Sequence, residues 1–531
     1  MNSHVGLVPF FKRGDIGGLT YLVTNNIVNY LIVIATLSGV LKWPDKVVFG
    51  YVIPGMSIGL FLGCCYYAWM GYRISKRDQR PDVTALPSGV STTAMFVMLY
   101  GVIMPLSYAV EDPMVAWSAA MAACFLGGVI EFVGGIVGPW MKKRIAALLG
   151  TVAGIGFIWM ATEGVFDIFQ DPILGLPVMI VAMLGVFGVY AFPKKIPPLV
   201  VAIVGGIVYA FCLGRTQVDF GDIGFYIPNP VNSIQYMIDG FAVIVPYLAV
   251  IIPVEIYNFI ETMDNVEGAN AAGDEYSVRQ AQFADGLFTM ISACFGGVVP
   301  NTVWLGHVSL KRTGAGVGYS VIAGIILLLA GVLGLFTVLS DIIPKAVVAI
   351  TFLWCAVDML SQAFRVVDKK YYAAIGVAMV PSVADFLYTQ VTGAAGLADL
   401  WTEKVASGIN DFAPDVCQAL TDAGCMWNGV AAVKAGAIVI GILLGTMVAF
   451  IIDRRLDKVA IVAFIGAVLS FIGIIHSAAI TINFTNQWGI GYLITGVVCL
   501  ILHFGRNIWC KPDEDMLEYV DDQSEKAQEI S

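Results

Sequence analysis

The sequence predicts an all-α polytopic membrane protein, in which many apolar helices cross a lipid bilayer. Hydrophobic residues make up 58% of the 531 residues, and the mean hydropathy is +0.82. Charged residues make up 13%, about half of the roughly 25% found in soluble domains. We expect no cleavable signal peptide, because Lys12, Arg13 and Asp15 precede the first apolar run. No basic patch for nucleic acid is evident.

Apolar runs long enough to span a bilayer, about 17 to 25 residues each, follow one another along the chain. They lie at 17–42, 46–72, 86–108, 114–140, 144–166, 172–192, 197–213, 238–265, 279–299, 317–340, 345–364, 371–393, 429–452, 457–478 and 486–505, with a shorter run at 301–311. If sides alternate, most of the 29 Lys and Arg residues fall on one side. The positive-inside rule then places both termini in the cytoplasm. We expect the chain to lie in the inner or plasma membrane of the cell.

Two of the segments are interrupted by glycine and proline. Pro87 and Gly89 open the run in VTALPSGVSTTAMF, and Pro300 opens the one in FGGVVPNTVWLGH, 213 residues later. A repeat of seven segments has an odd count, so its second copy is inverted. Paired interrupted segments at corresponding positions indicate the binding site of a transporter. Two proline-kinked helices without a site are the alternative.

Carboxylates occur inside the apolar run at 238–265. Glu255, Glu261 and Asp264 lie there, and Glu131 lies in the fourth run. Acids at membrane depth are retained mainly where they line a cavity or an ion path, so they predict a functional site. A helix end that only reaches the headgroups is the alternative.

At these residues the chain resembles the nucleobase/ascorbate transporter superfamily (nucleobase–cation symporter family 2), closest to its xanthine/uracil/purine permease branch. The resemblance covers about residues 15 to 455 and rests on ALPSGVST, FIETMDNVEGANAAGD, AQFADGLFTMISACFGG, and PNT with KRTGAG. It implies a uracil-permease-like fold of 7+7 inverted repeats, a core domain and a gate domain, discontinuous segments 3 and 10, and a homodimer.

The resemblance divides the chain between the core and gate domains, each built from two stretches, and the sequence adds a C-terminal transmembrane hairpin. The expected order is a cytoplasmic N-terminus (1–16), the first core stretch (17–140), the first gate stretch (141–236), the second core stretch (237–340), the second gate stretch (341–453), the additional hairpin (454–506) and an acidic cytoplasmic tail (507–531). Cys417 and Cys425 share the long loop before the fourteenth segment, and they bridge if that loop faces an oxidising compartment.

The resemblance also implies residue roles. Glu261 matches the acid that hydrogen-bonds the base, and Asp285 matches the acid of segment nine. The start of segment ten, which lines the pocket, corresponds to Pro300, Asn301 and Thr302. The chain departs from the family at Asp264, where the family has glycine, and at Gly306, where the family has a second substrate-binding acid. His307 follows this departure and is a further candidate for substrate binding, or a packing histidine.

The first half offers uncharged hydrogen-bonding groups. Asn25 and Asn29 share a helix face, and Ser88, Gly89 and Ser91 lie at the segment-three break. We expect them to line the pocket; helix-to-helix hydrogen bonding is the alternative.

The expected function is uptake of a nucleobase such as xanthine, guanine, hypoxanthine or uracil through alternating access, by H⁺ or Na⁺ symport. An ionised carboxylate accepts from two ring N–H donors. Asp264, Asp285 and Glu255 are candidates for the coupling ion or for positioning the substrate acid. No cofactor or metal is expected beyond a bound Na⁺ near Glu261, Asp264 and Asp285. An anion transporter of the same fold and a non-transporting sensor remain alternatives; an enzyme is not expected.

Overall fold

The computed structural model describes residues 7–110, 112–142, 157–158, 161–162, 164–186, 198–216, 223–304, 306–366, 369–397, 414–477 and 481–505. The chain forms two compact units, at 1–366 and 367–531. The expected tail at 507–531 lies outside the described residues.

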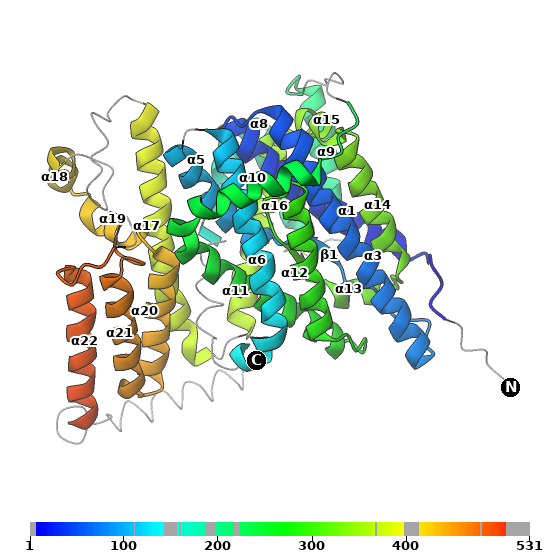
Figure 1. Ribbon diagram of the computed structural model, residues 1–531. Coiled ribbons are helices and arrows are strands. Elements are labelled where there is room, and N and C mark those ends of the chain that lie inside the picture. The colour runs from blue at the N-terminus through cyan, green and yellow to red at the C-terminus, as the bar shows by residue number, and fades with distance from the viewer. Residues whose placement is uncertain are drawn as a thin grey trace. The chain divides into compact units, whose positions relative to one another are not determined.

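The described residues of the first unit form helices and two short strands (Figure 1). Its helices before the first strand are α1 (Asp15–Ile34), α2 (Asp45–Val47) and α3 (Ile53–Asp78). Between the strands lie α4 (Thr92–Val97), α5 (Met104–Val110), α6 (Pro113–Lys142), α8 (Pro172–Val186), α9 (Pro198–Cys212), α10 (Pro230–Val243), α11 (Leu248–Ala271) and α12 (Val278–Cys294). After the second strand come α13 (His307–Arg312), α14 (Gly318–Val332), α15 (Leu335–Ile342) and α16 (Lys345–Val366).

Strand β1 (Ser88–Val90) pairs antiparallel with β2 (Asn301–Val303). Gly89 lies opposite Thr302, and the ladder continues at both ends, where Ser91 N donates to Pro300 O (2.9 Å) and Trp304 N donates to Pro87 O (2.8 Å). A short helix follows each strand: α4 begins after Ser91, and α13 begins after Gly306. Both segments that glycine and proline interrupt in the sequence are therefore broken in the structure.

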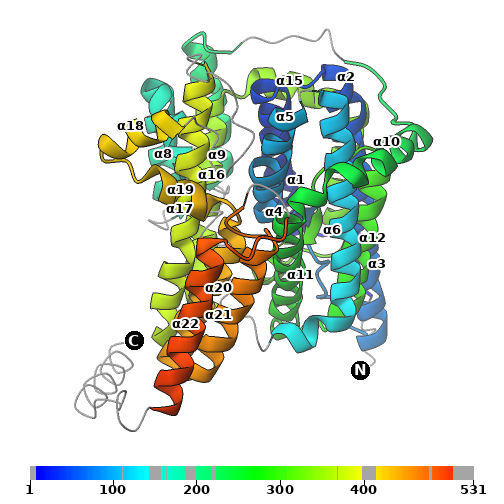
Figure 2. The same cartoon turned by 60° about the vertical axis from the view of Figure 1, so that its left-hand side comes forward.

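Helices α6, α11 and α12 pack closely in the same unit (Figures 1 and 2). The glycines of α6 allow this approach, because a Cβ atom at Gly127 would lie 2.5 Å from the carboxyl carbon of Glu255 and one at Gly128 would lie 2.7 Å from Gly286 O. Such small-residue contacts let membrane helices lie side by side. The packing fixes which face of α11 and α12 turns toward the strands.

The second unit is also helical. It contains α17 (Tyr372–Leu397), α18 (Pro414–Asp422), α19 (Trp427–Lys434), α20 (Ala437–Ile452), α21 (Leu456–Phe471) and α22 (Gln487–Phe504). Helices α19 and α20 meet at a bend of 90°. Helices α21 and α22 pack together at the place expected for the additional hairpin. Cys417 is buried, and Cys425 is a half-buried free thiol.

Within the described residues, five helices are long and apolar enough to cross a membrane, and six if the bent pair α19–α20 counts as one span. This is fewer than the sequence suggests, because several apolar runs are shorter helices in the structure, such as α8, α9 and α14. Helix α11 is long enough to cross a membrane, but it is not among these helices because it carries Glu255, Glu261 and Asp264. The chain is nevertheless an all-α, multi-pass membrane protein, as predicted.

Candidate functional site

Amide side chains from two helices hold the strand pair. On α1, Asn26 Oδ1 accepts from Val90 N (3.2 Å), and Asn29 Nδ2 donates to Val90 O (3.1 Å). On α11, Asn258 Nδ2 donates to Asn301 O (3.2 Å), and Asn265 Nδ2 donates to Val303 O (2.7 Å). Non-helical backbone inside a membrane needs such partners, since lipid supplies none. Hydrogen bonds from α1 and α11 therefore stabilise the strand pair within the first unit.

Ser91 joins the first break to the carboxylate of α11. Its hydroxyl donates to Glu261 Oε2 (3.2 Å) and accepts from Ala94 N (3.4 Å), which caps α4. Serine is a favoured N-cap because its oxygen satisfies a free N–H of the first turn. The residue that starts the helix thus also positions Glu261.

Asp285 of α12 is buried beside β2. Its Oδ2 accepts from Val303 N (2.9 Å) and from Thr262 Oγ1 (2.9 Å), and its Oδ1 accepts from the Tyr67 hydroxyl. Thr262 also bonds Thr302 Oγ1 (2.8 Å). Asp285 therefore orders the second strand together with Thr262, the residue that follows Glu261 in the sequence.

The indole of Trp304 packs against Gly89. Trp304 Nε1 donates to Val90 O (2.8 Å). A Cβ atom at Gly89 would lie 2.4 Å from Trp304 Cε2, so only glycine fits opposite Thr302 without displacing the indole. Gly89 serves backbone packing here.

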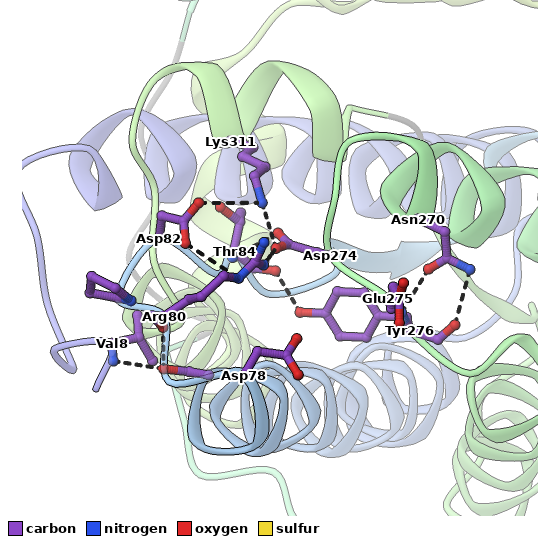
Figure 3. Close-up of polar contacts among 12 residues, drawn as sticks. Val8, Asp78, Arg80, Asp82, Thr84, Asn270, Asp274, Glu275, Tyr276 and Lys311 are labelled. Carbon is purple, nitrogen blue, oxygen red and sulfur yellow. Dashed lines mark hydrogen bonds and ion pairs between the residues drawn. The ribbon is translucent and has the colours of Figure 1, made fainter. Parts of the chain in front are cut away.

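A second polar group lies around Asp274, in the loop between α11 and α12 (Figure 3). Asp274 accepts from Arg80 Nη2 (2.7 Å), Lys311 Nζ (2.5 Å) and Thr84 N (3.1 Å). Burial alone would raise the pKa of Asp274, but the hydrogen bonds from His307, Lys311 and Thr84 outweigh it, and this pKa lies below its ordinary value. The cluster connects the ends of α3, α11 and α13.

His307 belongs to this second group. Its Nε2 lies 3.1 Å from Asp274 Oδ2, and its ring meets Tyr276 edge-on with centroids 5.8 Å apart. The contacts of His307 are thus with Asp274 and Tyr276 and not with Ser91 and Glu261; the sequence left substrate binding and packing open for this residue. Asp274, not singled out in the sequence, is the partner that holds it.

Gly306 has a left-handed backbone, with φ of +117°, and a Cβ atom there would lie 2.7 Å from Tyr21 Oη. This conformation favours glycine. It gives a physical reason why this chain has no acid at the position.

The structure places the remaining predicted residues as follows. Ser88, Pro300, Asn301 and Thr302 lie in or directly beside the strand pair, and Asn25 donates to Tyr21 O of its own helix (2.9 Å). Glu255 is buried against Gly127, and neither of its oxygens has a hydrogen-bond partner among the described residues. Asp264 is half-buried on α11.

No group of three or more His, Cys, Asp or Glu side chains suited to a metal ion occurs in the described part of the chain. Carboxylate and hydroxyl oxygens in or beside the strand pair come from Glu261, Asp285, Thr262 and Thr302. Hydroxyl and carboxylate oxygens are ligands of hard cations such as Na⁺.

Sequence reasoning missed Tyr67, Asn258, Thr262 and Asn265. The last three share the FIETMDNVEG stretch or its immediate flank with Glu261, and their spacing of three and four residues on a helix was the available signal. Tyr67 carried no such signal, since it comes from α3.

Solved structures that resemble this chain include three membrane transporter structures. The transmembrane domain of a cyanobacterium bicarbonate transporter, BicA, matches at 18% identity and a TM-score of 0.46, covering 70% of this chain and 95% of that one. SLC26A9 matches at 14% identity and a TM-score of 0.46, covering 71% and 62%. The murine anion transporter Slc26a9, in its inward-facing state, matches at 12% identity and a TM-score of 0.37, covering 66% and 67%. This chain thus spans less than two thirds of the SLC26A9 structure.

No curated protein matches the chain in sequence. The xanthine/uracil permease family model, described as "Permease family", matches residues 83–384, which include both strands, Glu261 and Asp285. This match covers more than half of the chain. The chain belongs to this permease family, the nucleobase/ascorbate transporters that its motifs resemble.

Proposed function

We propose that this membrane transporter takes up a nucleobase, such as xanthine, guanine, hypoxanthine or uracil, together with H⁺ or Na⁺. The observation that carries the proposal is the Glu261 carboxylate beside the broken strand ends, bonded to Ser91 (3.2 Å). A carboxylate accepts from two N–H donors of a planar base. Ser91 supplies its hydroxyl at that carboxylate, and Thr302 of β2 bonds Thr262, the residue that directly follows Glu261 (2.8 Å).

The charge around the strands supports a base rather than an anion. In the described residues, the side chains that bond the strand pair and Ser91 are amides, hydroxyls, an indole and carboxylates. The cations nearest in sequence to the breaks, Arg80 and Lys311, bond Asp274 instead. An anion beside Glu261 and Asp285 would need a positive partner to offset repulsion.

The transport cycle follows from the expected architecture. The inverted repeats form a core domain that carries the substrate and moves against a gate domain, and the protein acts as a homodimer with both termini in the cytoplasm. Interrupted helices at the centre of such repeats are typical of alternating-access transporters. No enzymatic reaction is proposed.

The test is uptake of labelled xanthine, guanine, hypoxanthine, uracil and sulfate into liposomes that contain the purified protein. H⁺ and Na⁺ gradients are imposed separately, and protein-free liposomes are the control. Accumulation of at least one base under one of the gradients supports the proposal. Accumulation of sulfate without any base would overturn it.

A further inference from the structure

Glu131 is a buried acid of the membrane-spanning helix α6 that the proposed substrate site does not use. Its side chain is 0% exposed. Oε1 accepts one long hydrogen bond, from Thr262 Oγ1 (3.3 Å), and Oε2 has no partner among the described residues. An ionised carboxylate in lipid surroundings is costly without several donors or a cation. Glu131 thus has too few hydrogen-bond donors to stabilise a permanent negative charge.

Thr262 connects Glu131 to Asp285. The same hydroxyl lies 2.9 Å from Asp285 Oδ2, and Asp285 is also 0% exposed. A threonine hydroxyl has one hydrogen, so it donates to one carboxylate at a time. Asp285 keeps its bonds from Tyr67 and Val303 N in either case, whereas Glu131 keeps none when Thr262 turns away.

Acidic groups on several helices interact with Glu131, and the cation Arg279 of α12 lies about one turn along α6, where its Nε donates to Gly135 O (3.3 Å). Interactions arrive from Asp285 on α12, from Glu255 and Glu261 on α11, from Tyr67 on α3 and from Cys124 on its own helix. Two carboxylates that share one hydroxyl cannot both be ionised without strong repulsion. One proton bound to either Glu131 or Asp285 removes this repulsion.

We propose that Glu131 and Asp285 hold one exchangeable proton across Thr262, and that this proton is the ion whose movement drives uptake. The proposal rests on the proposed function and adds Glu131 to it. The proton binds a carboxylate oxygen of Glu131 from one side of the membrane and leaves from the same atom toward the other, so only an O–H bond forms and breaks. A hard metal cation would instead need about six oxygens.

The pair is connected to the substrate site through two contacts. Thr262 directly follows Glu261 and bonds Thr302 of β2 (2.8 Å), and Asp285 holds Val303 N of the same strand. When the proton leaves, the two carboxylates compete for the Thr262 hydroxyl, and its bond to Thr302 changes with them. A change in the charge of Glu131 and Asp285 thus changes the hydrogen bonds of β2, the strand that borders the substrate.

Infrared difference spectroscopy tests the proton site without any substrate. The reconstituted protein is titrated, and the C=O band of a protonated carboxyl group is recorded for the native chain, Glu131→Gln, Glu131→Asp and Asp239→Asn. Asp239 is an exposed acid of α10 and serves as the control. We expect part of the native band to be lost in Glu131→Gln and retained in the other two. A band unchanged in Glu131→Gln overturns the proposal, provided that all four proteins elute as folded species.

Transport measurements test the coupling. We expect Glu131→Gln to exchange labelled base across the membrane as the native chain does, but to lose accumulation against a gradient and base-dependent proton entry. Accumulation at native levels, or accumulation driven by Na⁺ alone, overturns the proton assignment. If the native chain moves no base at all, the proposed function fails, and the infrared result still decides whether Glu131 holds a proton.

Discussion

The Ser91 hydroxyl donates to Glu261 across 170 positions of sequence, at 3.2 Å. Ser91 also caps α4, so the same residue begins a helix at the first break and orients the acid beside the second. The bond ties the first break to the middle of α11, in the other half of the first unit. A variant without this hydrogen bond keeps the Glu261 carboxylate but loses the group that positions it.

Ser91→Ala should weaken base binding while leaving Glu261 in place. Hydrogen bonds to charged groups contribute about 1.5–3 kcal/mol, which corresponds to roughly tenfold or more in Kd. Loss of the cap should also lower stability by about 1 kcal/mol. Equilibrium binding of a labelled base to purified protein measures the first effect. Ser91→Thr keeps a hydroxyl and should bind nearly as the native chain; an Ala variant with unchanged Kd would show that this bond does not position Glu261.

Gly306→Ala should destabilise the protein by about 1–3 kcal/mol, since a non-glycine residue is strained at positive φ and the added Cβ meets Tyr21 Oη. Gly17→Ala on α1 is the matched control, because nothing lies within 4 Å of a Cβ atom there. Thermal unfolding in detergent compares the two. Equal melting temperatures for Gly306→Ala and the native chain would refute the left-handed conformation at this position.

The sequence predicted the two breaks and the acid between them because glycine, proline and carboxylates are conspicuous inside apolar runs. It also identified the departure at Gly306, but the reason for it is a backbone angle, which no residue pattern displays. His307 was a candidate for substrate binding or a packing histidine, because it follows the departure from the family at Gly306. In the structure Asp274, 33 positions away in a loop, pairs with its ring. Such long-range partners depend on how helices are rotated, and spacing along one helix does not determine that.

Asp274→Asn should destabilise the protein by about 1–3 kcal/mol, because it removes the buried charge that Arg80 and Lys311 bond. Asp82→Asn is the control, since Asp82 is exposed and lies 3.6 Å from Arg80. Thermal unfolding provides the comparison. If both variants melt alike, the cluster does not stabilise the junction of α3, α11 and α13.

The stabilisation by Asp274 should also depend on pH. The pKa of this carboxyl is lower in the folded protein, so its contribution is complete above the unfolded-state value near 4 and is lost as the pH falls through the folded-state value. The native chain should therefore lose stability below about pH 4 by more than Asp274→Asn does. Parallel stability curves for the two proteins in acid would contradict this assignment.

Cys425 should react with a membrane-impermeant thiol reagent added outside intact cells. The reason is the orientation that the positive-inside rule predicts, with the loop before α19 outside, together with the free, half-buried thiol. The measurement is mass spectrometry of the labelled peptide, with Cys425→Ser as the control. Labelling that occurs only after lysis would reverse the orientation.

Binding of a labelled nucleobase to Glu261→Gln, compared with the native protein, tests the central claim most directly. Gln keeps the size of the side chain but loses the charge that accepts two N–H donors. Glu267→Gln, an exposed acid of the same helix, is the control. We predict that the native protein and the control bind the base, and that Glu261→Gln, eluting as a folded protein, binds it at least about tenfold more weakly. Equal affinity of all three proteins would contradict the account.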